Sequence, residues 1–185
     1  MNTPQKSNLF GDDIKVIDNF LDKQLFKLVQ NVAYNRDVKW IAQSTNPEAE
    51  RKLIIFDYAA VFEKEKWILE KYKEIFYLIF DEIQKNLDQE CYPGRVYFNR
   101  QAATVDGMLH LDDGDYTALL YISDYEKEYG GFTQLWISDQ EQKYILPIPN
   151  RILIFNSLIL HKGFGFSHLT NPRRISLAYK IHKKK

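Results

Sequence analysis

The sequence has only one cysteine, Cys91, among its 185 residues. A single thiol cannot form a disulfide within the chain, so a small secreted fold stapled by disulfides is excluded. The first residues, 1–6, are polar and contain no apolar stretch of the kind that a secretory signal needs. Both observations indicate a reducing compartment, and we expect a cytoplasmic protein.

The sequence also lacks an excess of charge of one sign and any long apolar run. The 25 basic and 25 acidic side chains cancel, so no general basic field attracts nucleic acid or an anionic membrane. A membrane-spanning helix needs about 18 to 20 apolar residues, whereas the apolar stretch 75–80 is followed at once by Asp81 and Glu82. We therefore expect a soluble protein with no membrane partner.

What the sequence does contain is enough apolar surface for one core. With 45% hydrophobic and 15% aromatic residues, a chain of 185 residues can bury one sizeable core but is short for two. We predict a single domain over residues 1–185. Within it, we expect residues 1–94 to be mostly helical support, residues 95–182 to form a β-rich core, and residues 183–185 to be a basic, solvated tail.

The first half of the chain has helical periodicity after a short strand-like segment at 14–17. From Asp22 onward apolar residues recur at helical spacing, and they do so again over a longer segment from about 64 to 87. The apolar positions are Leu25, Leu28, Val29, Val32 and Ala33 in the first segment, and Ile68, Tyr72, Ile75, Phe76, Ile79, Phe80 and Ile83 in the second. Each pattern predicts an amphipathic helix that packs against a sheet.

The second half consists of short β-rich runs separated by turn residues. We predict strands near 95–101, 117–123, 132–138, 143–146, 152–155 and 174–181. Successive runs of this kind are typical of a mainly β protein with a double-stranded β-helix (jelly roll) core. The N-terminal helices would then pack on one of its sheets.

Two histidines and one aspartate in this half have the spacing of a metal site. In an extended segment residues i and i+2 point to the same side, so His110 and Asp112 can converge on one ion. A third ligand, His161, follows a predicted strand 49 residues further on. Two imidazoles and one carboxylate suit a non-haem Fe(II) centre that keeps three coordination positions open.

Each part of this set also has a simpler interpretation. A lone histidine is more often a hydrogen-bonded residue than a ligand. The acidic run at 112–115 could be a solvated turn or a calcium loop, although the distal glutamate of an EF-hand is missing. A structural zinc site would need four closed ligands, often including cysteine, and Cys91 is remote in sequence.

An arginine on the last predicted strand suggests a second, acidic ligand. In that strand Arg174, Ser176 and Lys180 share one face with Ala178. A buried guanidinium is costly unless an anion meets it, and its planar fork pairs with a carboxylate. The alternatives are a structural salt bridge, or an anchor at Arg173 if the register slips by one residue.

Together these residues resemble the 2-oxoglutarate/Fe(II)-dependent dioxygenase superfamily, and its prolyl 4-hydroxylase-like branch in particular. The resemblance covers residues 95–180 and includes the double-glycine start of a strand, Gly130-Gly131-Phe132-Thr133, and the segment 149–156 before His161. It implies that His110, Asp112 and His161 bind Fe(II), and that Arg174 and Ser176 hold the C5 carboxylate of 2-oxoglutarate. By the same resemblance, Asn99 and Tyr121 would also contact this cosubstrate.

The resemblance also implies a reaction. The protein would couple oxidative decarboxylation of 2-oxoglutarate by dioxygen to hydroxylation of a C–H bond, with ascorbate as an auxiliary reductant. The first expected substrate is a prolyl residue or another amino acid, peptide or protein. Oxidative demethylation of nucleic acid is an alternative that the zero net charge disfavours. A non-catalytic jelly-roll module that binds a metal or ligand is an alternative of another class.

Overall fold

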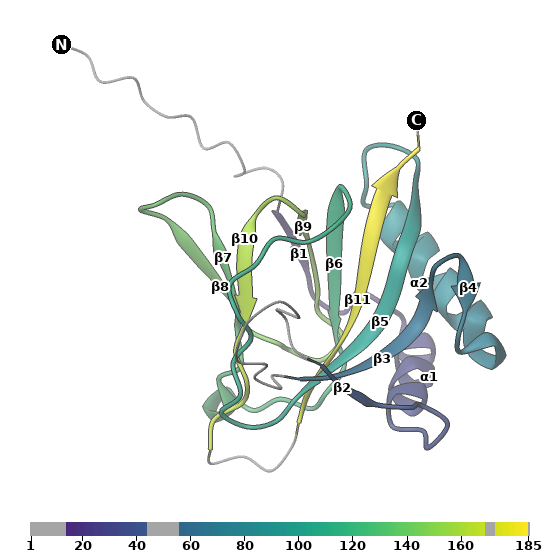
Figure 1. The fold of residues 1–185 in the computed structure, drawn as a ribbon, viewed down its shortest axis with the longest axis horizontal. Helices are drawn as coiled ribbons and strands as arrows, with labels where there is room; N and C mark the ends of the chain where they lie inside the picture. Colours follow the sequence, from purple (N-terminus) through teal and green to yellow (C-terminus); the bar gives the residue numbers. More distant parts are fainter. Residues whose placement is uncertain (1–13, 44–55, 169–172, 185) are drawn as a thin grey trace.

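The computed structural model describes residues 14–43, 56–168 and 173–184. Within these ranges the strands form two antiparallel sheets (Figure 1). The larger sheet has the order β1 (Ile14–Ile17), β9 (Ile152–Asn156), β6 (Tyr116–Tyr121), β11 (Arg174–Lys183), β5 (Cys91–Gln101), β3 (Phe56–Glu63) and β2 (Ile41–Gln43), and β4 (Lys66–Trp67) pairs with β3. The smaller sheet has the order β10 (Leu160–Gly163), β7 (Thr133–Trp136) and β8 (Gln142–Ile145). The predicted jelly roll is confirmed.

Two α-helices cover one face of the larger sheet, as predicted (Figure 1). Helix α1 (Lys23–Ala33) begins where the carboxylate of Asp22 accepts hydrogen bonds from the backbone N–H groups of Gln24 and Leu25. Helix α2 (Lys73–Gln84) follows a short 3-10 turn, Glu70–Tyr72. No helix within the described ranges is long and apolar enough to cross a membrane.

The predicted start of the second helix is wrong, because residues 64–69 are not helical. Strands β3 and β4 form a hairpin instead, with Lys64 and Glu65 at its turn and with φ angles of 51° and 60°. Positive φ at both central residues suits the twist of a tight hairpin and is incompatible with a helix. The rings of Phe62 and Trp67 pack across the hairpin with centroids 5.0 Å apart. Residues 56–67 thus extend the sheet, and the first 94 residues contribute strands as well as helical support.

The sequence also left two short strands unassigned. Strand β2 pairs with β3 at the edge of the larger sheet, and β10 pairs with β7 in the smaller one. Each has only three or four residues, too few for alternation to be visible in the sequence. Strand β10 matters for the site, since it carries His161.

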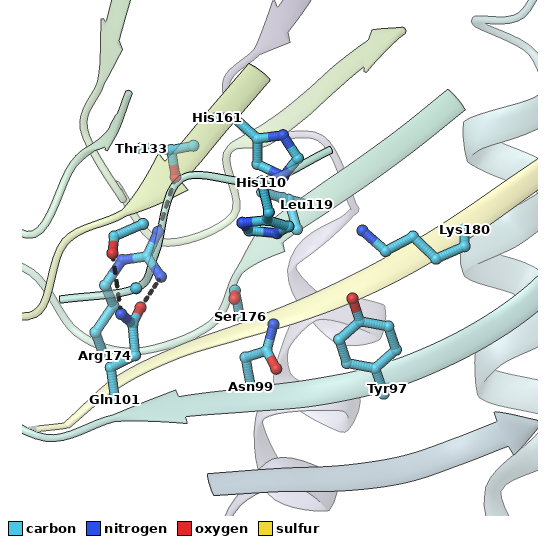
Figure 2. Close-up of a pocket in the computed structure, with 12 residues that line it drawn as sticks. Tyr97, Asn99, Gln101, His110, Leu119, Thr133, His161, Arg174, Ser176 and Lys180 are labelled. Carbon is cyan, nitrogen blue, oxygen red and sulfur yellow. Dashed lines mark hydrogen bonds between the residues drawn. The ribbon is translucent and has the colours of Figure 1, made fainter. Parts of the chain in front are cut away.

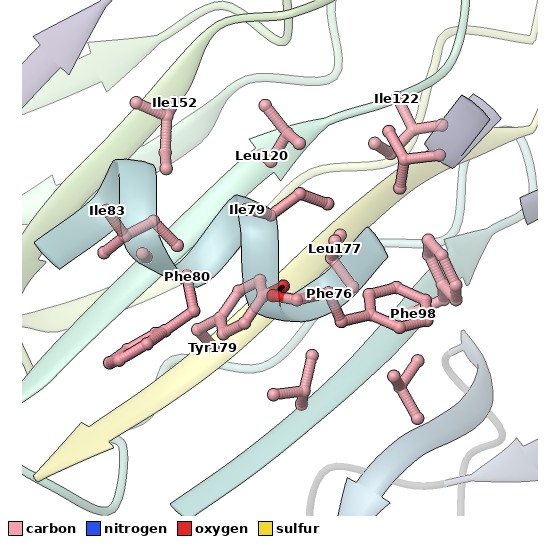
Figure 3. Close-up of a cluster of buried hydrophobic side chains, with 14 of the residues drawn as sticks. Phe76, Ile79, Phe80, Ile83, Phe98, Leu120, Ile122, Ile152, Leu177 and Tyr179 are labelled. Carbon is pink, nitrogen blue, oxygen red and sulfur yellow. Dashed lines mark hydrogen bonds between the residues drawn. The ribbon is translucent and has the colours of Figure 1, made fainter. Parts of the chain in front are cut away.

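The main core lies between helix α2 and the larger sheet (Figure 3). Phe76, Ile79 and Ile83 are fully buried on the sheet side of α2. The hydroxyl of Tyr179, on β11, donates to the backbone carbonyl of Phe76 at 2.9 Å. Burial of each large apolar side chain stabilises the fold by about 1.5–3 kcal/mol. A second apolar cluster, which includes Leu135 and Phe155, fills the space between the two sheets.

Asn150 connects the turn before β9 to the segment before α1. Its side-chain oxygen accepts from the backbone N–H of Leu21 at 2.9 Å, and its amide nitrogen donates to the carbonyl of Leu21 at 2.8 Å. Asn150 is buried and has a φ of 60°. A short amide side chain both tolerates this left-handed backbone and satisfies a buried peptide group.

We expect Asn150→Ala to lower the free energy of unfolding by about 2–4 kcal/mol, because the N–H and carbonyl of Leu21 stay buried without partners. Urea unfolding followed by circular dichroism measures the change. Asn19→Ala is the matched control, since Asn19 has a similar φ of 51° but an exposed side chain. Equal losses in the two variants would attribute the effect to backbone strain alone.

Candidate active site

A cavity lies between the larger sheet and the smaller one (Figure 2). Strands β5 and β11 supply its floor, and β7, β10 and the loop before β6 close it. Its polar lining comprises Tyr97, Asn99, Gln101, His110, Thr133, His161, Arg174, Ser176 and Lys180. Figure 2 shows Arg174 toward one end, Lys180 toward the other, and the histidine rings between them. Arg174, Ser176 and Lys180, which the sequence placed on one face of the last strand, therefore all line the cavity.

The predicted metal ligands meet in space. Potential ligand atoms of His110, Asp112 and His161 all lie within 4.8 Å of one another. The Nε2 atom of His161 is 3.1 Å from Oδ2 of Asp112, and Nε2 of His110 is 3.5 Å from Oδ1 of the same carboxylate. Within the described ranges this is the one group of three or more His, Cys, Asp or Glu side chains close enough to hold an ion.

Backbone pairing brings the three ligands together. His110 and His161 exchange two backbone hydrogen bonds of 3.0 Å, and the N–H of Asp112 donates to the carbonyl of Ser157 at 3.1 Å. The sequence predicted an extended segment over residues 110–112. Only His110 forms a bridge there, yet this suffices to fix the loop that carries two ligands against the strand that carries the third.

Both histidine rings are oriented by hydrogen bonds from their other nitrogen. Nδ1 of His110 lies 2.8 Å from the carbonyl of Met108, and Nδ1 of His161 lies 2.9 Å from the carbonyl of Ile159. Such contacts fix the tautomer with Nδ1 protonated and leave Nε2 free to bind a metal. Burial lowers the pKa of His161, which favours the neutral imidazole that coordination requires.

The carboxyl group of Asp112 has a strongly lowered pKa. Burial alone would raise its pKa, but the ammonium of Lys180 and hydrogen bonds with the two histidines outweigh burial and hold the pKa well below the usual range. The hydroxyl of Thr117 also donates to Oδ2 at 2.7 Å. Asp112 is therefore ionised at neutral pH and ready to act as a ligand. Since His110, Asp112 and His161 offer two imidazoles and one carboxylate whose ligand atoms converge, they fit a non-haem Fe(II) ion.

The other acidic residues of the 112–115 run do not join this group. Asp113 pairs with Arg95 at 2.7 Å, and a carboxylate oxygen of Asp115 accepts from the backbone N–H of Lys183. A calcium loop would direct several of these oxygens at one point. The run is divided among different partners, and the calcium interpretation has no support in the geometry.

Arg174 is buried at the opposite end of the cavity from Lys180. Its guanidinium donates to the carbonyl of Gly131 at 2.7 Å, to the side-chain oxygen of Gln101 at 2.7 Å and to the hydroxyl of Thr133 at 2.9 Å. All of these acceptors are neutral, and among the described residues no carboxylate pairs with Arg174. Burial accordingly lowers the pKa of Arg174. A guanidinium has five N–H donors, so some remain for an anionic ligand.

The neighbouring residues take different positions around this arginine. Ser176 is buried and lines the cavity, and Asn99 lies opposite it on β5 with a buried side-chain oxygen that has no partner among the described atoms. Arg173 points elsewhere and binds Asp57 at 2.8 Å. Tyr121 is fully buried behind the lining, and its hydroxyl donates to Thr133, which also accepts from Arg174.

Several polar residues around the site were given no role from the sequence. Gln101 and Thr133 hold Arg174, and Lys180 and Thr117 hold Asp112. Alternation along β11 does place Lys180 on the same face as Arg174, so a signal for it existed. The partners on β5, β6 and β7 are set by pairing between distant strands, which no local pattern reveals.

Trp40 and Trp136 lie away from the cavity lining. The ring of Trp40 packs against Phe98 in the helix-side core and under the guanidinium of Arg100, 4.2 Å away. Trp136 lies on β7, outside the lining. Neither therefore contacts the cavity that holds the metal ligands.

Comparisons with solved structures identify proteins that have a similar fold. No family model matches the sequence, and no curated protein sequence matches it. A prolyl 4-hydroxylase structure from Pseudomonas putida is similar, with 15% identity, a TM-score of 0.64 and 94% of each chain covered. A 2OG-Fe(II) oxygenase family oxidoreductase from Burkholderia pseudomallei has 13% identity and a TM-score of 0.70, with 94% of this chain and 86% of that chain covered.

A third similar structure is a prolyl hydroxylase from Trichoplax adhaerens in complex with a hypoxia inducible factor oxygen degradation domain peptide fragment. It has 14% identity and a TM-score of 0.67, with 94% of this chain and 84% of that chain covered. The protein therefore has the double-stranded β-helix fold of the prolyl hydroxylases and other 2-oxoglutarate/Fe(II) oxygenases, as the sequence resemblance implied.

Proposed function

We propose that this protein is a 2-oxoglutarate- and Fe(II)-dependent dioxygenase that hydroxylates a C–H bond. One observation carries the proposal: His110 and His161, whose Nε2 atoms converge on the carboxylate of Asp112, line the same cavity as a buried arginine that has no carboxylate partner among the described residues. A divalent ion and a dicarboxylate together complement both features.

In this assignment the protein residues bind and orient. His110, Asp112 and His161 hold Fe(II), which together with 2-oxoglutarate and dioxygen supplies the oxidising chemistry. Arg174 and Ser176 bind the far carboxylate of 2-oxoglutarate, and Asn99, which lines the cavity opposite Ser176, contacts the same cosubstrate. Tyr121 supports Arg174 through Thr133. Burial of the arginine strengthens its pairing with a carboxylate, because little water competes.

We further infer that the substrate is a prolyl residue or another amino acid, peptide or protein. Four large apolar side chains, Met108, Leu109, Leu111 and Leu158, are between 42% and 64% exposed on the two segments that carry the metal ligands. We call these four exposed side chains the apolar rim. An apolar surface of this kind suits a peptide better than a phosphate backbone, which needs basic side chains. The peptide bound to the similar Trichoplax enzyme agrees with this inference.

Anaerobic addition of Fe(II) and then 2-oxoglutarate should produce a weak visible charge-transfer band, since both would bind side by side in the cavity. Absorption spectroscopy under argon measures it. Asp112→Ala, which removes one ligand, should lose the band and the release of succinate in air. Ascorbate is added in a parallel series to learn whether it sustains turnover. A wild-type protein with neither band nor succinate would instead be a non-catalytic binding module.

Arg174→Ala should raise the 2-oxoglutarate concentration needed for half-maximal succinate release by about tenfold or more, because a charge-assisted contact is lost. Arg173→Ala is the matched control and should change it by less than about twofold, since Arg173 binds Asp57 near the surface. Equal effects of the two substitutions would move the anchor away from Arg174.

A substrate screen separates the two enzyme classes. Proline, proline-containing peptides and methylated single-stranded oligonucleotides are each added, and substrate-dependent succinate release is measured. We expect stimulation by an amino acid or peptide, and Leu158→Glu should weaken it, because a charged side chain would replace part of the apolar rim. Stimulation by the oligonucleotide alone would contradict the proposed substrate class.

A further inference from the structure

Lys180 is an unusual residue for the centre of a sheet. It is 2% exposed on β11, and its ammonium pairs with Asp112 and lies 3.4 Å from the hydroxyl of Thr117. Its cross-strand partners are Thr117 on β6 and Arg95 on β5, so two cationic side chains occupy opposed positions on β11 and β5. Opposed like charges and a buried ammonium both cost stability, and packing alone would favour an uncharged side chain at this position.

The contacts of Asp112 are distributed unequally between its two oxygens. Oδ2 accepts from Thr117 at 2.7 Å, pairs with Lys180 and lies 3.1 Å from Nε2 of His161. Oδ1 has one close polar neighbour among the described contacts, Nε2 of His110 at 3.5 Å. Each oxygen thus faces the Nε2 atom of one histidine, but among the described contacts only Oδ2 is also held by Thr117 and Lys180.

We propose that Lys180 is a positioning residue that, with Thr117, holds one oxygen of Asp112 and so makes Asp112 a one-oxygen ligand of the metal. This inference rests on the proposed function of the site. An octahedral ion with three single-atom protein ligands has three positions left, enough for a bidentate cosubstrate and dioxygen. If Asp112 used both oxygens, one of those positions would be lost.

The charge of Lys180 adds a second effect. An ammonium beside the ligand carboxylate repels a divalent cation, so it weakens metal binding while it attracts the doubly negative cosubstrate. Lys180 therefore shifts affinity from the metal toward 2-oxoglutarate. A lysine that only stabilised the fold would not change the affinities for the metal and for 2-oxoglutarate in opposite directions.

The test compares Lys180→Met, Lys180→Arg and Lys183→Met. Lys183 lies on the same strand with its ammonium over the ring of Tyr116, outside the cavity lining, and so serves as control. Each protein is titrated with Co²⁺ without oxygen and followed by visible absorption. The cobalt-loaded protein is then titrated with 2-oxoglutarate. Thermal unfolding of each metal-free variant is recorded in parallel.

We expect Lys180→Met to bind Co²⁺ about tenfold more tightly, because the nearby repulsive charge is gone. The same variant should bind 2-oxoglutarate about tenfold more weakly and show an altered cobalt spectrum, since Asp112 can now use both oxygens. Lys180→Arg, which keeps the charge and the donors, should restore both affinities toward the wild-type values. Lys183→Met should change neither.

Unchanged affinities in Lys180→Met would overturn the proposal, and so would a parallel loss of both, which indicates a structural lysine. If the methionine variant does not fold, Lys180→Gln gives the same comparison with a polar but uncharged side chain. Failure of the proposed function is distinct, because then the wild-type protein would bind Co²⁺ no better than Asp112→Ala does.

Discussion

Strand β11 is paired on both edges, with β5 and β6, and its two faces meet opposite physical demands. Leu177 and Tyr179 face helix α2 and belong to the apolar core. Arg174, Ser176 and Lys180 face the cavity and are all buried. Because side chains alternate strictly along a strand, a shift of one residue would place charges in the core and apolar groups in the site. The register of β11 is the constraint on which both depend.

The site concentrates buried charge in two places that differ in how the charge is satisfied. Around Asp112 the charge is balanced within the protein, by Lys180 and by a hydrogen bond from Thr117. Around Arg174 it is not, because its acceptors, Gln101 among them, are neutral. A buried cation without a counter-anion is costly, so the arginine end of the cavity is preorganised for an acidic ligand. This difference distinguishes the two ends of the cavity, and we propose that the cosubstrate carboxylate binds at the Arg174 end and the metal beside Asp112.

Backbone hydrogen bonds, rather than a long strand, bring the predicted metal ligands together. The loop before β6 is fixed to β10 where His110 pairs with His161, and Asp112 is fixed by its bond to Ser157. The exposed apolar side chains near these ligands, Leu111 and Leu158, are carried by the same two segments. The pairing that orients the ligands therefore also builds the rim over which we propose that a peptide approaches.

The sequence by itself determined the jelly roll, the amphipathic face of α2, and the alternation that puts Arg174 and Ser176 together, because these follow from local periodicity. It also determined which residue types could bind a metal. The hairpin of β3 and β4 could not be predicted from the sequence, since the spacing of Phe62 and Trp67 reflects pairing across a turn. Only the tertiary structure decided that Lys180 meets Asp112, because their strand and loop are 68 residues apart and are joined by packing between segments that no local pattern connects.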